Sequence, residues 1–517
     1  MAEGTYIGAI DQGTTSTRFM LYNNKAQVVA SHQVEFTQIM PEPGLVEHDP
    51  MEILDTVKLC MKETLEKVST THPGVKKGLK GIGITNQRET TVVWSKSTGL
   101  PLYNAIVWMD VRSASVCRRL EKELSDGQSH FVKSSGLPIS TYFSATKLMW
   151  LLESVPEVKE AAEKGDALFG TIDSWLIWNL TGGVKGGVHI TDCSNAARTL
   201  LMDLRTLQWD KSTLKTLKIP ESILPRIVSN AEIMGAIRED WPAAGVPIAG
   251  CLGDQHAAVL GQQCKKGQAK STYGTGCFIL LNTGEEIVPS NHGLLSTIGF
   301  KLGANAPTNY ALEGSIAIAG AAVQWLRDNL QIISKASESE TLAATVKDTG
   351  GVYFVPAFGG LFAPWWRDDA RGVLVGISRY TSKAHITRAV LESICFEARE
   401  VLTAMKADYS STHESDEKFL LRVDGGAATN NLLMQLQADI LGSPVVRPAD
   451  PETTALGAAY AAGLATGVWT EQQIFEDAEH FAKPTTFYPK VEAEDREKRY
   501  KSWTKAVERS FGLADLA

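Results

Sequence analysis

The opening of the chain alternates short apolar runs with polar turns. The runs TYIGAI, STRFMLYN and AQVVASHQVEF follow one another within residues 5–36. Three short strands in succession predict an antiparallel meander. Further on, LKGIGITN at 79–86 predicts a buried strand, and TVVWSK directly after it predicts another.

Helical patterns begin after the meander. Asp49-Pro50 predicts the start of a helix, because Asp is a common N-cap and Pro is favoured at the first helical position. The apolar face of this helix consists of Met51, Ile53, Leu54, Val57 and Met61. Helical patterns also dominate residues 112–165 and 316–333.

The middle of the chain repeats the character of its opening. VPIAGCLGDQHAAVLGQQ indicates a strand, a Gly-Asp turn and a helix, and GQAKSTYGTGCFILLNTG indicates a strand pair around a tight Gly-Thr-Gly turn. A chain of 517 residues is also too long for one core. We therefore predict a duplicated α/β architecture with two domains, residues 1–260 and 261–517.

Composition narrows the class of protein. The chain is 44% hydrophobic and 21% charged, and its net charge of −8 argues against a general nucleic-acid binder. Its seven cysteines are odd in number and never spaced as CxxC, which favours reduced thiols. Neither a secretory signal nor an apolar run of about 18 residues is apparent. We expect a cytoplasmic protein without a transmembrane segment.

The most familiar catalytic motifs are missing from the sequence. It contains no GxxxxGK[ST], no GxGxxG after a strand, no HExxH and no GxSxG. These absences remove the P-loop nucleotide, zinc-protease and serine-hydrolase interpretations.

Three glycine-bearing turns remain as candidates for phosphate binding. In the first, AIDQGTTSTR, small residues let the backbone approach an anion, while Thr14, Thr15 and Ser16 donate hydroxyls and Arg18 adds charge. Asp11 would repel phosphate, so its sensible use is to hold Mg²⁺, through water. The others are Gly274-Thr275-Gly276 and a Gly425-Gly426 pair that opens a predicted helix.

A second group of residues suits a polyhydroxy substrate. Arg88-Glu89 follows a buried strand, and Asp254-Gln255 lies at the end of another. Together with Tyr142 they offer hydrogen-bond donors and acceptors. Trp108 and Phe278 could present flat faces to the C–H side of such a molecule.

Each of these features also has a purely structural interpretation. Arg88-Glu89 could be a surface ion pair, Trp108 and Phe278 could be core residues, and Asp254 could only cap the following helix. A DxGT hairpin alone is more often just a turn, and a DGG before a helix is commonly only a cap. Taken singly, the structural interpretation is favoured for all of the substrate candidates except Asp254.

Nine stretches of the sequence, in family order and over essentially its whole length, resemble the FGGY carbohydrate kinases. They are GAIDQGTTSTR, GLVEHDPMEI, GITNQRETTVVW, YFSATKLMWLLE, GDQHAAVLGQ, STYGTGCFILLNTG, AGAAVQWLRD, RVDGGAATNNLLMQLQADILG and ETTALGAAYAAG. The resemblance implies an actin/hexokinase-like α/β ATPase fold, with two ribonuclease-H-like domains flanking a cleft. NQRETT and YGTGCF point to glycerol as the substrate within the family. The implied reaction is transfer of the γ-phosphoryl group of ATP to a terminal hydroxyl of glycerol, with Mg²⁺ present.

The resemblance also implies roles for individual residues. Asp254 looks like the base that takes the proton from the reacting hydroxyl, and Asp11 like the Mg²⁺ anchor. Residues that look like the glycerol site are Arg88, Glu89, Trp108, Tyr142, Asp254, Gln255 and Phe278. Residues that look like contacts to the phosphates or to ADP are Thr14, Thr15, Ser16, Arg18, Thr275, Gly320, Gln324, Gly426 and Asn430. The family usually forms dimers or tetramers, so a homo-oligomer is expected.

Other functions compatible with these motifs stay open at this point. The chain could be another sugar or polyol kinase of the family, such as a xylulokinase or a gluconokinase. It could also be a nucleotide-driven binding protein on the same fold, although no peptide-binding domain remains in the sequence. An inactive scaffold is the third alternative, against which the presence of Asp11, Arg88 and Asp254 counts.

Overall fold

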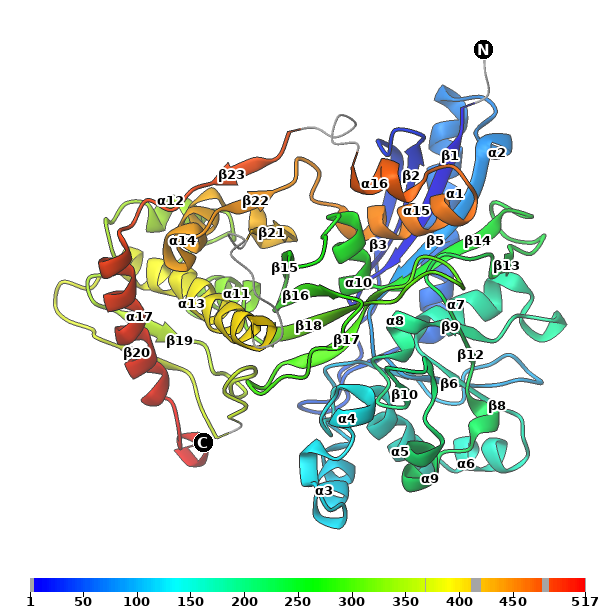
Figure 1. Cartoon of the computed structure of the whole chain (residues 1–517), viewed down its shortest axis with the longest axis horizontal. Coiled ribbons are helices and arrows are strands. Elements are labelled where there is room, and N and C mark those ends of the chain that lie inside the picture. The colour runs from blue at the N-terminus through cyan, green and yellow to red at the C-terminus, as the bar shows by residue number, and fades with distance from the viewer. Residues whose placement is uncertain (1–3, 368, 411–419, 477–482, 517) are drawn as a thin grey trace.

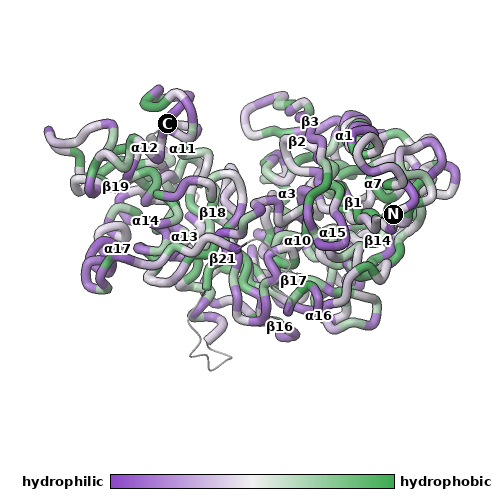
Figure 2. The backbone as a smooth tube through the Cα atoms, turned by 90° about the horizontal axis from the view of Figure 1, so that it is seen from above, coloured by the Kyte–Doolittle hydropathy of each residue, from purple (hydrophilic) through white to green (hydrophobic). Residues whose placement is uncertain are grey.

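The computed structural model contains two large β-sheets, each covered by helices (Figure 1). It describes residues 4–367, 369–410, 420–476 and 483–516. We call the part built around the first sheet the first lobe and the part built around the second sheet the second lobe. Seen from above, α13, α14 and α17 belong to one lobe and α1 and α7 to the other (Figure 2).

The first sheet has six strands in the order β13-β14-β5-β1-β2-β3. The predicted meander is confirmed, because β1 pairs antiparallel with β2, and β2 antiparallel with β3. Strands β5 and β14 join β1 on its other side, both parallel. Their bounds are β1 Tyr6–Gln12, β2 Ser16–Asn23, β3 Val28–Glu35, β5 Leu79–Asn86, β13 Gly235–Ala236 and β14 Pro247–Gly253.

The second sheet has seven strands in the order β17-β18-β16-β15-β21-β22-β23. Its strands are β15 Ala269–Tyr273, β16 Cys277–Gly284, β17 Leu295–Phe300, β18 Asn309–Ile316, β21 Leu421–Asp424, β22 Val445–Arg447 and β23 Thr485–Phe487. Strands β18-β16-β15 form an antiparallel meander that continues into parallel β21 and β22. The series β18-β16-β15-β21-β22 repeats β3-β2-β1-β5-β14, which confirms the predicted duplication.

The remaining strands form five small pairs. They are β4 Glu47–His48 with β7 Ala105–Ile106, β6 Val92–Ser95 with β8 Ala167–Gly170, β9 Ile190–Asp192 with β12 Arg226–Val228, β10 Met202–Asp203 with β11 Gln208–Trp209, and β19 Tyr353–Val355 with β20 Val373–Val375. Strands β5 and β6 confirm the two strands predicted from LKGIGITN and TVVWSK.

Seventeen α-helices are assigned in the described residues. Those of the first half are α1 Pro50–Thr71, α2 Val75–Gly78, α3 Ala114–Glu123, α4 Val132–Ser135, α5 Ser144–Ser154, α6 Pro156–Glu163, α7 Ile172–Thr181, α8 Cys193–Ala196, α9 Lys211–Leu217 and α10 Asp254–Gly261. Those of the second half are α11 Gly320–Asp328, α12 Glu338–Ala343, α13 Lys383–Ser410, α14 Asn431–Leu441, α15 Thr453–Ala465, α16 Glu471–Phe475 and α17 Ala493–Glu508. The start of α1 is as predicted, since the Asp49 carboxylate accepts from the backbone N–H of Met51.

Two helix predictions were wrong in their limits. The helix expected over 316–333 is shorter, because Ile316 still belongs to β18 and α11 ends at Asp328. The helix expected to open at Gly425-Gly426 begins only at Asn431. A short 3₁₀ turn over Gly426–Thr429 precedes this helix, and Gly425 before it has a positive φ near 87°.

Helices α10 and α15 lie between the two sheets. On one side of the first sheet, α1 and α7 bury Ile53, Val57 and Trp175 against Ile10 and Phe19. Its other side packs on α10 and α15 in a cluster that also reaches Leu280 and Ala311 of the second sheet. Helices α13 and α14 cover the far side of the second sheet. The two lobes therefore share one continuous apolar core around α10 and α15.

Candidate functional site

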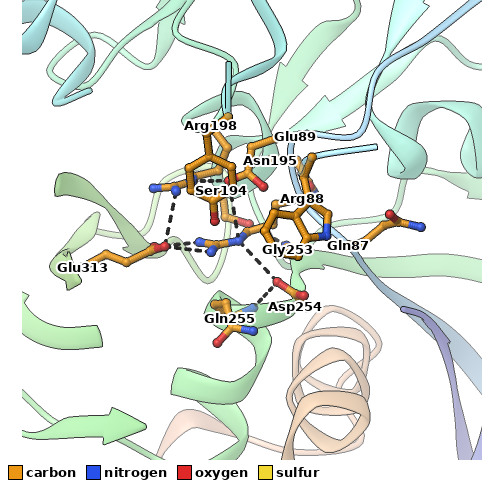
Figure 3. Close-up of polar contacts among 12 residues, drawn as sticks. Gln87, Arg88, Glu89, Ser194, Asn195, Arg198, Gly253, Asp254, Gln255 and Glu313 are labelled. Atoms are coloured by element: carbon orange, nitrogen blue, oxygen red, sulfur yellow. Dashed lines mark hydrogen bonds and ion pairs between the residues drawn. The ribbon is translucent and has the colours of Figure 1, made fainter. Parts of the chain in front are cut away.

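The ends of two neighbouring parallel strands bring the central polar residues together. Strand β5 ends at Asn86, two residues before Arg88, and β14 ends at Gly253, directly before Asp254. Because β5 and β14 are parallel neighbours, their carboxyl ends meet at one edge of the sheet. As a result, Nε of Arg88 lies 3.2 Å from Oδ1 of Asp254. The structure thus brings Arg88 and Asp254 together (Figure 3).

Arg88 is held on its other side by a residue of the second lobe. Its Nη1 and Nη2 donate to the two carboxylate oxygens of Glu313, on β18, at 2.6 and 2.7 Å. The side chains of Arg88 and Glu313 are 2% and 0% exposed, whereas that of Asp254 is 29% exposed. Of these three charged side chains, that of Asp254 is thus the most exposed.

Glu89 has a second buried arginine beside it. Nε of Arg198 donates to Oε1 of Glu89 at 2.6 Å, and Nη2 of Arg198 donates to Oε1 of Glu313 at 3.2 Å. Glu89 itself adopts a left-handed backbone conformation, with φ near 58°, which turns the chain sharply after β5. The surface ion pair considered for Arg88-Glu89 is therefore excluded, since both side chains are buried.

Burial and neighbouring charges act in opposite directions on these carboxyl groups. Burial raises the pKa of Asp254, while the nearby Arg88 and Lys270 lower it. Burial likewise raises the pKa of Glu89 against the lowering effect of Arg88 and Arg198. Burial would also raise the pKa of Glu313, but Arg198 and Arg88 hold it well below its usual range.

Three aromatic side chains gather next to this group. The ring of Trp108 makes edge contacts with the rings of Tyr142 and Phe278, at centroid distances of 5.7 and 5.9 Å. All three side chains are only partly buried. The Arg88 guanidinium lies 5.8 Å from the Phe278 ring centroid, and that of Arg198 lies 5.5 Å from the Tyr142 ring centroid. The arrangement forms an apolar wall beside Arg88 and Asp254.

Gln255 is oriented by a lysine that the sequence did not single out. Lys270, on β15, is fully buried, and its Nζ donates to Oε1 of Gln255 and, at 2.9 Å, to Oγ1 of Thr272. Because an ammonium group can only donate, the amide oxygen of Gln255 faces Lys270. The Nε2 group of Gln255 is then left as a donor toward a ligand.

The opening turn joins this site through Trp108. The β1–β2 hairpin closes with a hydrogen bond from the Gly13 N–H to the Ser16 carbonyl, at 2.9 Å. Nε1 of Trp108 donates to Oγ1 of Thr14 at 3.0 Å. Thr15 is exposed, and Ser16 accepts from Nε2 of Gln33 at 3.2 Å. The Thr14 hydroxyl therefore lies next to the apolar wall.

Asp11 and Arg18 face each other across the β1–β2 hairpin. Burial raises the pKa of Asp11 to about 6, with Arg18 lowering it and Asp254 raising it further. Strands β1 and β14 both pair in parallel with β5, so Asp11 near the end of β1 and Asp254 directly after β14 lie at the same edge of the sheet. Arg18 also pairs with Glu452, the residue before α15, and donates to Gln33.

The glycine turns of the second lobe come together at the end of the second sheet. The Gly320 N–H donates to the Gly274 carbonyl, and the Ala321 N–H to the Thr275 carbonyl, at 2.9 and 3.0 Å. A Cβ on Gly425 would lie 2.5 Å from the Tyr273 carbonyl oxygen. The Gly425 turn therefore packs directly on the residue before the Gly274-Thr275-Gly276 turn. Thr275 and Gly426 are exposed at this junction.

Two of the predicted nucleotide residues contribute in other ways. Gln324 has an exposed side chain one turn along α11 from Gly320. Asn430 is the N-cap of α14, where its Oδ1 accepts from the Leu433 N–H at 2.9 Å and its Nδ2 donates to Oγ of Ser339. Within the described part of the chain, no hydrogen bond joins Gln324 or Asn430 to the Thr275 turn.

Sequence reasoning missed Arg198, Lys270 and Glu313. Each is a charged residue next to or within an apolar segment, and Lys270 and Glu313 lie in the interior of strands. A charge in a buried strand is rarely tolerated without a partner. That signal could have marked both positions, although it would not have identified their partners.

A further group of acidic residues lies behind the site. One carboxylate oxygen each of Asp173 and Asp192 and the Sγ of Cys251 lie within 4.8 Å of one another, and all three residues are buried. The carboxylates are already occupied by protein donors, among them Thr191 and Asn230. All seven cysteines are free and buried.

Comparisons with known proteins cover the whole chain. The N-terminal domain of the FGGY family of carbohydrate kinases matches residues 6–261, and its C-terminal domain matches residues 269–466. A glycerol kinase of Arabidopsis thaliana is 66% identical over 100% of this chain and 99% of its own length. Glycerol kinase 2 of Streptomyces avermitilis is 53% identical over 98% of this chain and 97% of its own length.

Solved structures give the same picture. The crystal structure of Plasmodium falciparum glycerol kinase with ADP superposes with a TM-score of 0.88 at 39% identity, and the match covers 98% of each chain. A ligand-bound xylulose kinase from Lactobacillus acidophilus gives a TM-score of 0.83 at 23% identity, over 98% of this chain and 99% of its own. This second similarity concerns the fold alone.

Proposed function

The chain belongs to the FGGY family of carbohydrate kinases and has their actin/hexokinase-like fold, and from this premise we infer how it works as a kinase. It transfers the γ-phosphoryl group of ATP to glycerol and so forms sn-glycerol 3-phosphate. The observation in this molecule that supports the assignment most strongly is the partly exposed Asp254 carboxylate beside Arg88, Glu89 and the Trp108 wall.

We propose that Asp254 is the general base. Its carboxylate would accept the proton of a terminal hydroxyl as the oxygen of that hydroxyl attacks the γ-phosphorus. The partial exposure of its side chain supports this role, as does its place at the end of a central strand. Burial raises the pKa of Asp254, which makes its carboxylate a better proton acceptor, and the neighbouring Arg88 and Lys270 oppose this rise.

The other residues of the proposed glycerol site would bind and orient the substrate. Arg88 and Gln255 offer donors, Glu89 offers an acceptor, and Tyr142 offers a hydroxyl that can act as either. Trp108 and Phe278 would cover the C–H groups of the three-carbon chain. A site that pairs each hydroxyl rejects analogues that lack one, because its buried polar groups would be left unpaired.

The nucleotide would extend from the opening turn to the glycine turns of the second lobe. We propose that Thr14, Thr15, Ser16 and Arg18 contact its phosphates. The exposed Thr275 and Gly426 and the half-buried Gly320 would contact ADP, with Gln324 and Asn430 beside it. The close packing of the Gly274 and Gly425 turns supports this, since small residues allow backbone groups to approach a ligand.

Asp11 is the proposed anchor for Mg²⁺. Asp11 and Asp254, at the same edge of the first sheet, offer the carboxylate oxygens that Mg²⁺ prefers, so the residues present fit the ion. When bound, Mg²⁺ neutralises charge on the β- and γ-phosphate oxygens. Asp11 would hold the ion and so orient the γ-phosphate toward the hydroxyl.

We also propose a division into domains at residues 260 and 261, a cytoplasmic location and a homo-oligomer, either a dimer or a tetramer. The seven free cysteines support a reducing compartment. None of the described helices combines the length and apolar character needed to cross a bilayer. The oligomer follows from the family resemblance, and light scattering of the purified protein tests it.

Substrate choice is tested by comparing acceptors. ADP formation from Mg-ATP should be stimulated by glycerol, with kcat/KM for glycerol exceeding that for xylulose and for gluconate. Greater activity with either sugar would make the chain another kinase of the family. ATP turnover that is independent of every acceptor would favour a nucleotide-driven binding protein.

A further inference from the structure

We propose that Glu313 and Arg198 are positioning residues for the glycerol site, and that Glu313 performs this role from the second lobe. The inference rests on the proposed function, because it concerns how Arg88 and Glu89 are presented to glycerol. Neither Glu313 nor Arg198 is among the residues that the family resemblance assigned.

Four charged side chains form a closed ring of alternating sign, which we call the charge ring: Arg88, Glu313, Arg198 and Glu89. Its shortest contacts are 2.6 Å from Arg88 to Glu313, 3.2 Å from Arg198 to Glu313 and 2.6 Å from Arg198 to Glu89. A longer contact of 3.9 Å between Arg88 and Glu89 closes it. Figure 3 shows Glu313 approaching both arginines from the side opposite Glu89.

The charge ring is buried and balanced. The four side chains are at most 2% exposed, and two positive charges face two negative ones. Removing one member would leave an unpaired buried charge, which is strongly unfavourable. The remaining charged groups would then turn toward other partners.

The direction of each contact indicates what the charge ring does for the substrate. Glu313 engages both Nη groups of Arg88, so the edge of the guanidinium that faces Asp254 carries Nε. Arg198 binds Glu89 through Oε1. The ring thereby fixes which atoms of Arg88 and Glu89 remain for glycerol.

The same two residues connect further parts of the glycerol site. Arg198 lies over the ring of Tyr142, another proposed glycerol residue. Glu313 lies on β18, whose neighbour β16 carries Phe278 of the apolar wall. A displacement of Glu313 would therefore affect proposed glycerol residues of both lobes: Arg88 in the first and Phe278 in the second.

The test compares Glu313→Gln and Arg198→Lys with the wild-type enzyme. Each variant keeps nearly the same size but removes a charge or a fork of donors. We expect KM for glycerol to rise at least about tenfold, the loss typical of one hydrogen bond to a charged group, while KM for ATP stays within about twofold. The ratio of kcat/KM for glycerol to kcat/KM for propane-1,3-diol should be lower in both variants than in the wild type.

Glu392→Gln is the matched control. Glu392 is also a buried glutamate between two arginines, with Arg388 at 3.1 Å and Arg499 at 2.6 Å, but it lies on α13 away from the site. This variant should keep the wild-type KM for glycerol. It shows what the loss of a buried ion pair does when the pocket is untouched.

Several results would overturn the inference. One is a wild-type KM for glycerol in both Glu313→Gln and Arg198→Lys. Another is a parallel rise of the KM values for glycerol and ATP, the mark of a merely structural role. If Glu313→Gln does not fold, Arg198→Lys, which keeps the charge, decides by the same measurements. A wild-type enzyme that glycerol does not stimulate would instead overturn the proposed function, and the inference with it.

Discussion

Single residues behind the site control the place of Asp254. The backbone N–H of Gly253 donates to Oγ of Ser194 at 3.0 Å, and Ser194 in turn donates to Asp192. Asp192 also accepts from Nδ2 of Asn230 at 2.8 Å. The residue before the proposed base is therefore tied to a buried carboxylate, which itself lies next to the carboxyl of Asp173.

The buried pair of Asp173 and Asp192 gives the enzyme a pH-dependent stability. Burial and the charge of Asp192 raise the pKa of Asp173 to about 7, well above its value in an unfolded chain. Between about pH 4 and pH 7 the folded state binds a proton that the unfolded state has lost, so this contribution to stability disappears as the pH rises through 7.

Asp173→Asn should remove that dependence. The neutral amide has nearly the same shape and needs no proton, so the variant should melt higher relative to wild type at pH 8 than at pH 5, by a few degrees. Thermal unfolding of both proteins at the two pH values checks this. An equal difference in melting temperature at both pH values would contradict it.

At the scale of elements, glycines let α15 approach its neighbours closely. A Cβ on Gly457 of α15 would overlap the Ala257 carbonyl of α10, and one on Gly83 of β5 would overlap the Ala458 carbonyl of α15. Gly261 of α10 meets the Thr453 carbonyl in the same way. The absence of side chains at these points brings α15 onto both α10 and the first sheet.

Gly457→Ala should therefore destabilise the protein. The added methyl group has to push α15 from α10, an overpacking that costs about 1–3 kcal/mol. Thermal unfolding measures the loss, with Gly359→Ala as the control, because a Cβ at Gly359 meets open space. Equal melting temperatures for the two variants would show that α15 can shift without cost.

Local signals account for most of what the sequence predicted correctly. The β1–β3 meander, α1 with its Asp49 cap, β5 and the β14–α10 junction all follow from patterns within ten to twenty residues. The wrong limits of α11 have a physical reason. Ile316 lies in a strand buried on both faces, and such a strand has the same apolar run as a buried helix.

Residues of the candidate site also differ in whether local sequence could predict them. Arg88, Glu89 and Asp254 could be predicted because polar residues directly follow buried strands. Glu313 and Arg198 could not, since each partner lies more than one hundred residues away in the chain. The pairing of the two lobes brings Glu313 to Arg88 and Arg198, and the folding of the first lobe brings Arg198 to Glu89.

At the scale of the whole molecule, the chain returns to its first lobe near its end. Helix α15, residues 453–465, packs on β1, β5 and β14, and α16 follows it (Figure 1). The cluster around α10 and α15 includes Ile7 and Ala9 of the first strand. The first sheet is thus completed by residues that come after the second sheet.

A fragment of residues 1–260 should for this reason not fold on its own. One face of its sheet would lose the cover of α15 and expose apolar side chains to water. Circular dichroism during heating should show no cooperative transition for the fragment, in contrast to the full chain. A cooperative transition within a few degrees of that of the full chain would contradict the prediction.

The central proposal for this enzyme is that Asp254 is the base for phosphoryl transfer to glycerol. The most direct test measures glycerol 3-phosphate and ADP formed from Mg-ATP, with and without glycerol, by the wild type and by Asp254→Asn. We expect the wild type to form equal amounts of glycerol 3-phosphate and ADP. In Asp254→Asn the rate of their formation should fall at least about a hundredfold, while the melting temperature stays that of the wild type. Glycerol-dependent turnover that is unchanged in Asp254→Asn would contradict it.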